Sequence, residues 1–147
     1  MKVRDIMTKE VVCINKDTSA KDLIKKFIEH KLHSAPVVDG SNVLVGMISI
    51  RDIFKVLTVK YLNEGNSMVK EVGVSSHAQM EDVVMAEDIM TGSVKCIKEE
   101  DSILKAIMNM YADNIVRLPV VDDRNVVRGL LSQSDVLRSM LSLSKKK

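Results

Sequence analysis

The 147-residue sequence is poor in aromatic side chains, which make up 3% of it and include no tryptophan. Proteins that bind single-stranded nucleic acids stack bases on aromatic rings, so this class is disfavoured. The 22 basic and 20 acidic residues nearly balance and are spread along the chain, which argues against a DNA- or RNA-binding face. The core must be built from aliphatic side chains and from the ten methionines.

Cysteine is also scarce, since only Cys13 and Cys96 are present and neither belongs to a CxxC pattern. Two cysteines are too few for a disulfide framework and suit a reducing compartment. The N-terminus lacks the apolar segment of a signal peptide, and no stretch reaches the ~18 continuous apolar residues of a membrane span. We therefore expect a cytoplasmic protein that does not interact with a membrane.

The sequence contains an internal repeat. A shift of 83 residues aligns residues 3–57 with 86–140 without a gap, and 18 of these 55 positions are identical. Identity in one register over that length is not a chance event, so the chain consists of two copies of one structural unit. The shared stretches are DIMT (Asp5 to Thr8 and Asp88 to Thr91), PVVD (Pro36 to Asp39 and Pro119 to Asp122), and the spacing of Gly46, Ser49 and Asp52, repeated at Gly129, Ser132 and Asp135.

Each half is predicted to contain the same five elements. A short apolar strand is followed by a helix that begins after an N-cap oxygen, then by two strands around a turn-rich tetrapeptide, and then by a second helix. The predicted strands are Val11–Ile14, Ala35–Val38 and Val43–Ile48 in the first half and Val94–Ile97, Leu118–Val121 and Val126–Leu131 in the second. The helices begin after Thr18–Ser19 and Asp101–Ser102, and again near Arg51 and Ser134.

This order makes each half an α/β unit with a three-stranded sheet. Apolar residues recur at helical spacing in the first helix of each half, and these stripes are expected to face the sheet. Such a small sheet leaves an apolar face uncovered, so the two halves are expected to pack together about a pseudo-twofold axis. The stripes are Leu23, Ile24, Phe27 and Ile28, and Ile103, Ile107, Met110 and Tyr111.

The repeated S-x-x-D pattern has two interpretations. Ser49 ends a predicted strand and Asp52 lies in the first turn of the next helix, and Ser132 and Asp135 repeat this arrangement. In the first interpretation these residues only cap the helix, because the serine oxygen accepts from a backbone N–H and the carboxylate lies at the positive helix end. In the second they bind a ligand, because an ionised carboxylate accepts hydrogen bonds from hydroxyls and a helix N-terminus favours phosphate. The two roles can coexist.

The DIMT, PVVD and G-h-[IL]-S-x-x-D stretches, in this order, resemble the CBS domain, a family named after cystathionine beta-synthase, and the tandem resembles a Bateman module. The resemblance implies an α+β fold of two β-α-β-β-α repeats packed through their sheets. It divides the chain into CBS domain 1 at residues 1–62, a connecting segment at 63–82, CBS domain 2 at 83–144 and a basic tail at 145–147.

The resemblance also implies two clefts between the halves, which in many relatives hold AMP, ADP, ATP or S-adenosylmethionine. In relatives the hydroxyl approaches a phosphate, the carboxylate accepts from the ribose hydroxyls, and residues near DIMT and before PVVD lie along the adenine. The apolar positions among them are also explained as core residues that need no ligand, and for the two cysteines we favour this explanation. The residues assigned to ligand binding are Thr8, Cys13, Ala35, Ser49, Arg51 and Asp52, and Thr91, Cys96, Arg117, Leu118, Ser132 and Asp135.

The halves differ in their cationic residues. Arg51 lies inside the first S-x-x-D, where the second has Ser134, and Arg117 precedes the second PVVD stretch, where the first half has Ser34. A guanidinium at Arg117 can bind phosphate oxygens bidentately, or the residue can be an ordinary exposed or ion-paired arginine. The two clefts are therefore not expected to be equivalent.

The sequence offers little to an enzyme, because it has no P-loop, no GxGxxG, no metal cluster and no nucleophile–base pair at a known spacing. We expect a non-catalytic regulatory module that senses an adenosine nucleotide, requires no cofactor and forms a homodimer of CBS pairs. It is expected to regulate a separate effector protein or its own assembly. The alternative is a ligand-free dimerisation or protein-docking module, in which the S-x-x-D residues only cap helices.

Overall fold

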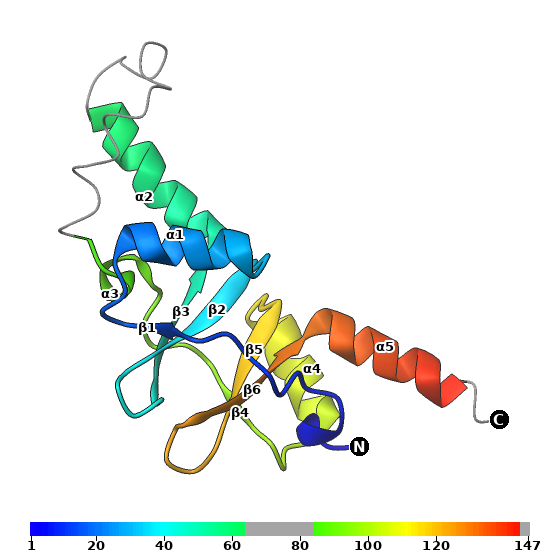
Figure 1. Cartoon of the computed structure of the whole chain (residues 1–147). Helices are drawn as coiled ribbons and strands as arrows, with labels where there is room; N and C mark the ends of the chain where they lie inside the picture. Colours follow the sequence, from blue (N-terminus) through cyan, green and yellow to red (C-terminus); the bar gives the residue numbers. More distant parts are fainter. Residues whose placement is uncertain (64–83, 145–147) are drawn as a thin grey trace. The chain divides into compact units, whose positions relative to one another are not determined.

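The computed structural model describes residues 1–63 and 84–144, without the side chains of residues 59–63 and 143–144. The predicted connecting segment lies outside these residues apart from Asn63, and the basic tail lies outside them entirely. The elements of the first half (Figure 1) are η1 (Val3–Asp5, a 3-10 helix), β1 (Ile14–Asn15), α1 (Ala20–Glu29), β2 (Ser34–Val38), β3 (Leu44–Ser49) and α2 (Ile50–Asn63). Those of the second half are α3 (Ala86–Ile89), β4 (Ile97–Lys98), α4 (Ile103–Ala112), β5 (Arg117–Val121), β6 (Val127–Ser132) and α5 (Gln133–Ser144).

The chain forms two compact units that exchange the first segment of each repeat. Unit 1 contains the described residues of Met1–Val11, Ser41–Leu44 and Lys95–Lys147, and unit 2 contains those of Val12–Gly40 and Val45–Val94. Each unit therefore holds the sheet of one repeat together with the DIMT segment of the other. The domain boundaries predicted from the repeat separate the two repeats along the sequence, whereas each compact unit combines segments of both repeats. These boundaries therefore remain a prediction.

Unit 2 is built on a sheet of order β1-β2-β3, in which β1 is parallel to β2 and Ile14 pairs with Val37. Helix α1 begins at its N-cap Ser19, whose side chain accepts from the backbone N–H of Asp22. Leu23 of α1 is buried against the core that contains Ile14 and Val37. The incoming 84–94 segment is held by backbone hydrogen bonds to the turn before α1, including one of 2.8 Å from Ala86 N to Thr18 O.

Unit 1 repeats this arrangement with a sheet of order β4-β5-β6. Here β4 is parallel to β5, and β5 is antiparallel to β6 with an irregularity between Val120 and Val121. The N-terminal segment is held as in unit 2, through a hydrogen bond of 3.0 Å from Val3 N to Asp101 O. Val3, Leu118, Val120 and Leu131 are fully buried in its core.

The two hairpin loops meet within unit 1. Asn42 and Asn125 both have a left-handed backbone, with φ of 62° and 63°, which asparagine tolerates better than most residues. The N–H of Leu44 donates to the carbonyl of Asn125, and the N–H of Val127 donates to the carbonyl of Asn42. The repeated asparagine therefore forms the turn in each loop, and its carbonyl accepts a backbone hydrogen bond from the other repeat.

The predicted fold class is confirmed, because each half contains a three-stranded sheet in β-α-β-β-α order. Two predictions of detail are wrong. Residues 11–13 and 94–96 are not strand, because pairing with the neighbouring strand starts only at Ile14 and Ile97. The helical stripes are wider than the face that each sheet covers, so Ile28 and Tyr111 are exposed.

Candidate functional site

Ser49 and Asp52 form a reciprocal cap at the junction of β3 and α2. The backbone N–H and the hydroxyl of Ser49 both donate to Asp52 Oδ2, at 2.8 and 2.9 Å, and the N–H of Asp52 donates to Ser49 Oγ at 3.2 Å. This satisfies N–H groups that the first turn of a helix leaves without intrahelical partners. Asp52 Oδ1 accepts no hydrogen bond from any residue that the structure describes.

Ser132 and Asp135 form the same cap between β6 and α5. The N–H and the hydroxyl of Ser132 donate to Asp135 Oδ2 at 2.9 and 2.6 Å, and the N–H of Asp135 donates to Ser132 Oγ at 3.1 Å. In contrast to Asp52, the remaining oxygen of Asp135 is occupied, because Arg138 Nη1 donates to Oδ1 at 2.9 Å. The capping interpretation of S-x-x-D is therefore realised in both halves, and it leaves a free acceptor in the first half only, within the described residues.

The two DIMT threonines lie beside the S-x-x-D motif of the other repeat. Thr91 and Met47 exchange both backbone hydrogen bonds, at 2.9 and 3.0 Å, next to Gly46 in unit 2. Thr8 and Leu130 do the same in unit 1, with both bonds at 2.9 Å. Sequence position alone groups each threonine with its own repeat, and nothing in two identical DIMT stretches signals this exchange.

A pocket of about 340 Å³ in unit 2 brings Asp52 and Thr91 together. It is lined by side chains of both repeats, since Asp52, Lys55 and Val56 come from α2 while Asp88 and Thr91 come from the DIMT segment. Lys55 and Asp88 were not assigned to the site from the sequence. The signal for Lys55 was its position three residues after Asp52, which places both side chains on one helix face.

Arg117, the first residue of β5, lies opposite Ser132 in the antiparallel β5–β6 ladder. Side chains of directly opposite residues lie on the same face of a sheet, so the half-buried guanidinium stem of Arg117 is next to the Ser132 cap. The equivalent residue of the first half, Ser34, has a buried hydroxyl without a hydrogen-bond partner among the described residues. Arg51 is exposed in the first turn of α2.

The remaining predicted residues lie in or near the cores. Ala35 and Leu118 are fully buried, so their side chains pack against other core residues. Cys13 and Cys96 are free thiols of intermediate exposure in the segments before β1 and β4. Burial raises the pKa of the Cys13 thiol, which favours its protonated form.

The fold and these motifs match a known family over both halves. The model of the CBS domain matches residues 3–59 and again residues 86–142. The chain belongs to the CBS domain family. The two matches correspond to the internal repeat, so each half is a CBS repeat.

Among proteins with similar sequences, inosine-5'-monophosphate dehydrogenase of Methanocaldococcus jannaschii is 29% identical over 137 residues. That alignment covers 93% of this chain but only 23% of the enzyme. The uncharacterised protein MJ1426 of the same organism is 31% identical over 157 residues, covering 96% of this chain and 92% of that protein. CBS pairs similar to this one therefore occur both as a small part of a larger enzyme and as nearly the whole of a protein.

Among solved structures, the CBS domain pair of MJ0100 in complex with 5'-methylthioadenosine and S-adenosyl-L-methionine is 27% identical, with a TM-score of 0.72. It covers 99% of this chain and 98% of that one. The complex of CBSX2 with AMP has a TM-score of 0.76 at 24% identity, covers 97% and 98% of the two chains, and shows the shared fold.

The structure describes neither a membrane span nor a metal-ligand cluster. No helix within residues 1–63 and 84–144 has the length and hydropathy needed to cross a bilayer. Over the same residues, no group of three or more His, Cys, Asp or Glu side chains could hold a metal ion.

Proposed function

We propose that this CBS pair is a non-catalytic regulatory module that binds an adenosine nucleotide at its two S-x-x-D sites. The observation that carries the proposal concerns Asp52, whose Oδ1 accepts no hydrogen bond from the described residues and which lines a pocket together with Thr91 and the cation of Lys55. A pocket with an acceptor-only group and a cation suits a ligand that has both hydroxyls and a negative charge.

The chemistry of each group matches one part of a nucleotide. The two ribose hydroxyls donate hydrogen bonds, and the Asp52 carboxylate accepts them. A phosphate gains from the positive end of α2 and from Lys55, which has no ion-pair partner among the described residues. In unit 1, Arg117 lies directly opposite Ser132 in the β5–β6 ladder, and its guanidinium suits a phosphate in the same way.

The class of ligand is supported by the bound molecules of the MJ0100 pair. Both 5'-methylthioadenosine and S-adenosyl-L-methionine contain adenosine with an intact ribose diol, and that pair is 27% identical to this chain. We propose AMP, ADP, ATP or S-adenosylmethionine as the ligand, with no cofactor required. The free thiols of Cys13 and Cys96 accord with a cytoplasmic protein.

Regulation follows if the ligand binds two arrangements of the module with different affinities, because a ligand shifts an equilibrium only by that difference. We propose that the regulated activity belongs to a separate effector protein or to the assembly of this chain itself.

Calorimetric titration of the full chain with AMP, ADP, ATP and S-adenosylmethionine tests the proposal. At least one ligand is expected to bind, and Asp52→Asn and Asp135→Asn are each expected to weaken one site about tenfold or more, because each removes charge-assisted hydrogen bonds. Asp17→Asn is the matched control, since Asp17 is exposed and lies outside the pocket. Lack of binding by all four ligands at millimolar concentration would contradict the proposal.

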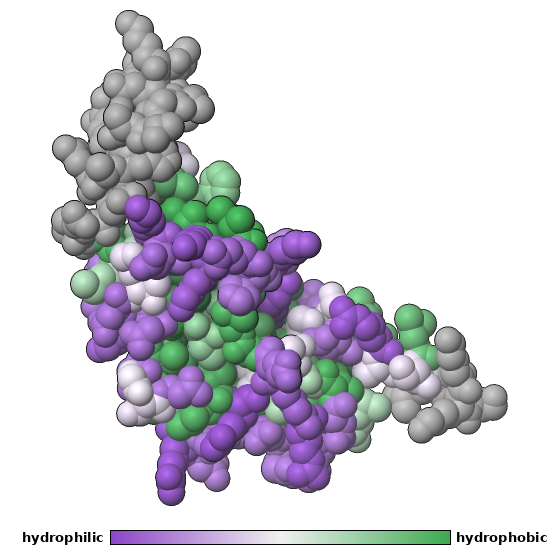
Figure 2. Space-filling view, viewed as in Figure 1, coloured by the Kyte–Doolittle hydropathy of each residue, from purple (hydrophilic) through white to green (hydrophobic). Residues whose placement is uncertain are grey.

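A second function, homodimerisation, is supported by two apolar grooves. The groove between α1 and α2 in unit 2 has a volume of about 500 Å³, and the groove between α4 and α5 in unit 1 has about 280 Å³. Figure 2 shows apolar surface beside α2 and near the end of α5. Phe54 and Leu137, at equivalent positions of α2 and α5, are each 63% exposed. Large apolar patches of this kind mark protein interaction sites.

The grooves fit a second copy of this chain. Every residue that lines the α4–α5 groove lies 83 positions after a residue that lines the α1–α2 groove, so one chain presents two versions of the same surface. We propose that these surfaces are covered by a second copy of this chain in a symmetric dimer. If no nucleotide binds, dimerisation or protein docking through these grooves is the remaining function.

A further inference from the structure

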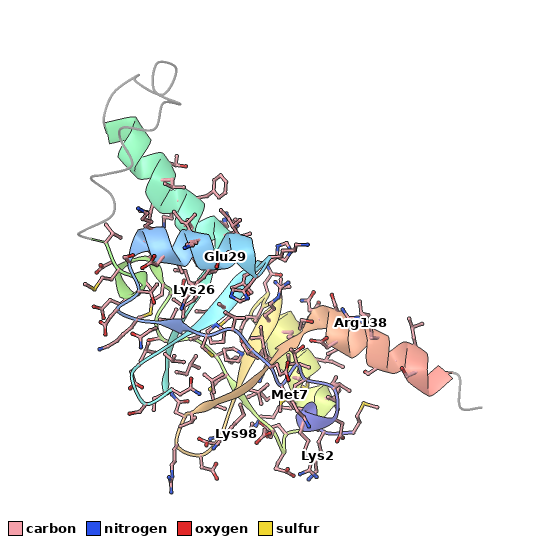
Figure 3. All side chains as sticks on the ribbon, viewed as in Figure 1. Lys2, Met7, Lys26, Glu29, Lys98 and Arg138 are labelled. Carbon is pink, nitrogen blue, oxygen red and sulfur yellow. The ribbon has the colours of Figure 1, made fainter. Side chains whose placement is uncertain are left out.

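The two S-x-x-D carboxylates differ in what occupies their second oxygen. Arg138 lies one helical turn after Asp135 on α5 (Figure 3) and donates to Asp135 Oδ1 at 2.9 Å. The residue at the equivalent position of α2 is Lys55, which lines the Asp52 pocket without pairing to Asp52. The two repeats therefore differ in their carboxylates. Within the described residues, Asp52 keeps an oxygen that accepts no hydrogen bond, whereas both oxygens of Asp135 are occupied.

We infer that Arg138 competes with the ribose of the ligand for Asp135, so that the Asp52 site has the higher affinity and fills first. This inference rests on the proposed function, because it concerns the order in which the same two sites bind. A ribose diol needs carboxylate acceptors. At Asp135 one oxygen is used by the Ser132 cap and the other by the Arg138 guanidinium.

The competition is modest because the ion pair is only partly shielded from water. The side chain of Arg138 is 73% exposed, whereas that of Asp135 is 11% exposed. An exposed i, i+3 ion pair is worth up to about 1 kcal/mol, which corresponds to about a fivefold change in affinity. Because screening by salt weakens such a pair, the penalty at Asp135 must shrink as ionic strength rises.

Lysine and arginine at this position act differently because of their geometry. A guanidinium presents a planar set of donors that reaches a carboxylate on the same helix face, whereas an ammonium is a point charge on a flexible stem. Within the part of the chain that the structure describes, Arg138 is paired with Asp135, whereas Lys55 has no ion-pair partner. Replacing each by glutamine therefore removes a competitor from the second site and only an unpaired cation from the first.

The test uses the full chain and 5'-methylthioadenosine, a probe that has the ribose diol but no phosphate, so that direct attraction between phosphate and arginine does not contribute. Asp52→Asn isolates the second site, and Asp135→Asn isolates the first. In the Asp52→Asn chain, Arg138→Gln is expected to tighten binding about two- to fivefold. The same Arg138→Gln substitution in the Asp135→Asn chain is the matched control and is expected to leave affinity unchanged.

Salt separates competition from a purely structural effect. In the Asp52→Asn chain, affinity for the neutral probe is expected to rise between low and high NaCl, and Arg138→Gln is expected to abolish that rise. AMP is titrated alongside as the test of binding itself. If AMP or the probe binds but Arg138→Gln gives no gain for either in the Asp52→Asn chain, the inference alone is overturned. If neither binds the native chain, the proposed function and the inference both fail.

Discussion

Gly46 of β3 faces the side chain of Met90, and a Cβ atom on Gly46 would stand 2.5 Å from Met90 Sδ and 2.7 Å from the carbonyl oxygen of Thr91. The methionine can move, but the carbonyl belongs to the backbone pair between Thr91 and Met47. Gly46→Ala is therefore expected to push the DIMT segment away from β3 and to lower the free energy of unfolding by about 1–3 kcal/mol. Urea unfolding followed by circular dichroism measures this change.

Gly40→Ala is the control, because a Cβ there meets no atom within 4 Å. Its effect is expected to stay within about 0.5 kcal/mol, as for most surface substitutions. Gly129, which meets Met7 (Figure 3) and the carbonyl of Thr8 at similar distances, should behave like Gly46. Equal stability of the Gly46→Ala and Gly40→Ala chains would show that the close approach of Thr91 is not maintained in solution.

The caps of α2 and α4 allow the stabilising role of a serine to be separated from a binding role. Ser49 caps α2 inside the proposed site, and Ser102 caps α4 through its side chain, which accepts from the N–H of Lys105. Ser49→Ala and Ser102→Ala are each expected to cost about 1 kcal/mol of stability. Only Ser49→Ala is expected to weaken AMP binding as well, because Ser49 also orients the Asp52 carboxylate.

Thermal unfolding measures the stability of each of these two variants, and AMP titration measures the AMP affinity of each. A loss of AMP affinity of the same size in both would mean that binding responds to stability in general. Loss of stability without loss of affinity in Ser49→Ala would restrict Ser49 to the capping role.

Much of this site could be predicted from the sequence, because the S-x-x-D pattern is local. A serine that ends a strand and a carboxylate three residues later must meet at the helix start, and Ser49 and Asp52 do so. The exchange of Thr8 and Thr91 between units could not be predicted, because two identical DIMT stretches give no indication of which strand each one pairs with. The Arg138 ion pair could not be predicted either. The sequence has a cation at both equivalent positions, Lys55 and Arg138, and does not indicate which of the two reaches the carboxylate.

The predicted strand boundaries were wrong for a physical reason. The β-branched and cysteine residues of 11–13 suit a strand in isolation, yet a strand also requires a partner, and the parallel pairing with β2 begins at Ile14. Periodicity predicts that Ile28 and Tyr111 face the sheet, but both are exposed, because periodicity identifies an apolar face without showing what covers it.

Dimerisation through the two grooves predicts a dependence on Phe54. This side chain lines the α1–α2 groove and is largely exposed in the single chain, so a second copy would desolvate it. Phe54→Lys is expected to weaken the dimer at least tenfold, as expected when a buried charge replaces an apolar anchor. Sedimentation velocity over a range of protein concentrations measures the shift towards monomer.

Leu104→Lys is the control for added charge, because Leu104 is 66% exposed on α4 and does not line either groove. It is expected to leave the sedimentation coefficient unchanged. A native chain that sediments as a monomer at every concentration would contradict dimerisation. The grooves would then be candidate binding sites for a different protein.

Stability is expected to fall in acid through carboxyl groups of unit 1. The ammonium of Lys105 donates to Asp101 at 2.8 Å and lowers the pKa of that carboxyl, and a backbone hydrogen bond from the Lys98 N–H acts in the same direction. The N–H of Val126 similarly lowers the pKa of Asp122. A carboxyl whose pKa is lower in the folded than in the unfolded state stabilises the fold above the unfolded pKa, and this contribution is lost as pH falls through the folded pKa. The loss therefore begins below about pH 4.

Asp101→Asn checks this assignment. The variant is expected to lose less than about 1 kcal/mol of stability at pH 7, because the pair with Lys105 is solvent-screened. It is expected to differ less from the native chain at pH 3, which lies below the ordinary pKa of an unfolded aspartate, so that part of the stabilisation by charged Asp101 is lost in the native chain as well. Urea unfolding at both pH values, with Asp17→Asn as the control, measures the two differences. An equal difference at pH 7 and pH 3 would mean that the cost arises from altered hydrogen bonds of the side chain rather than from the charge.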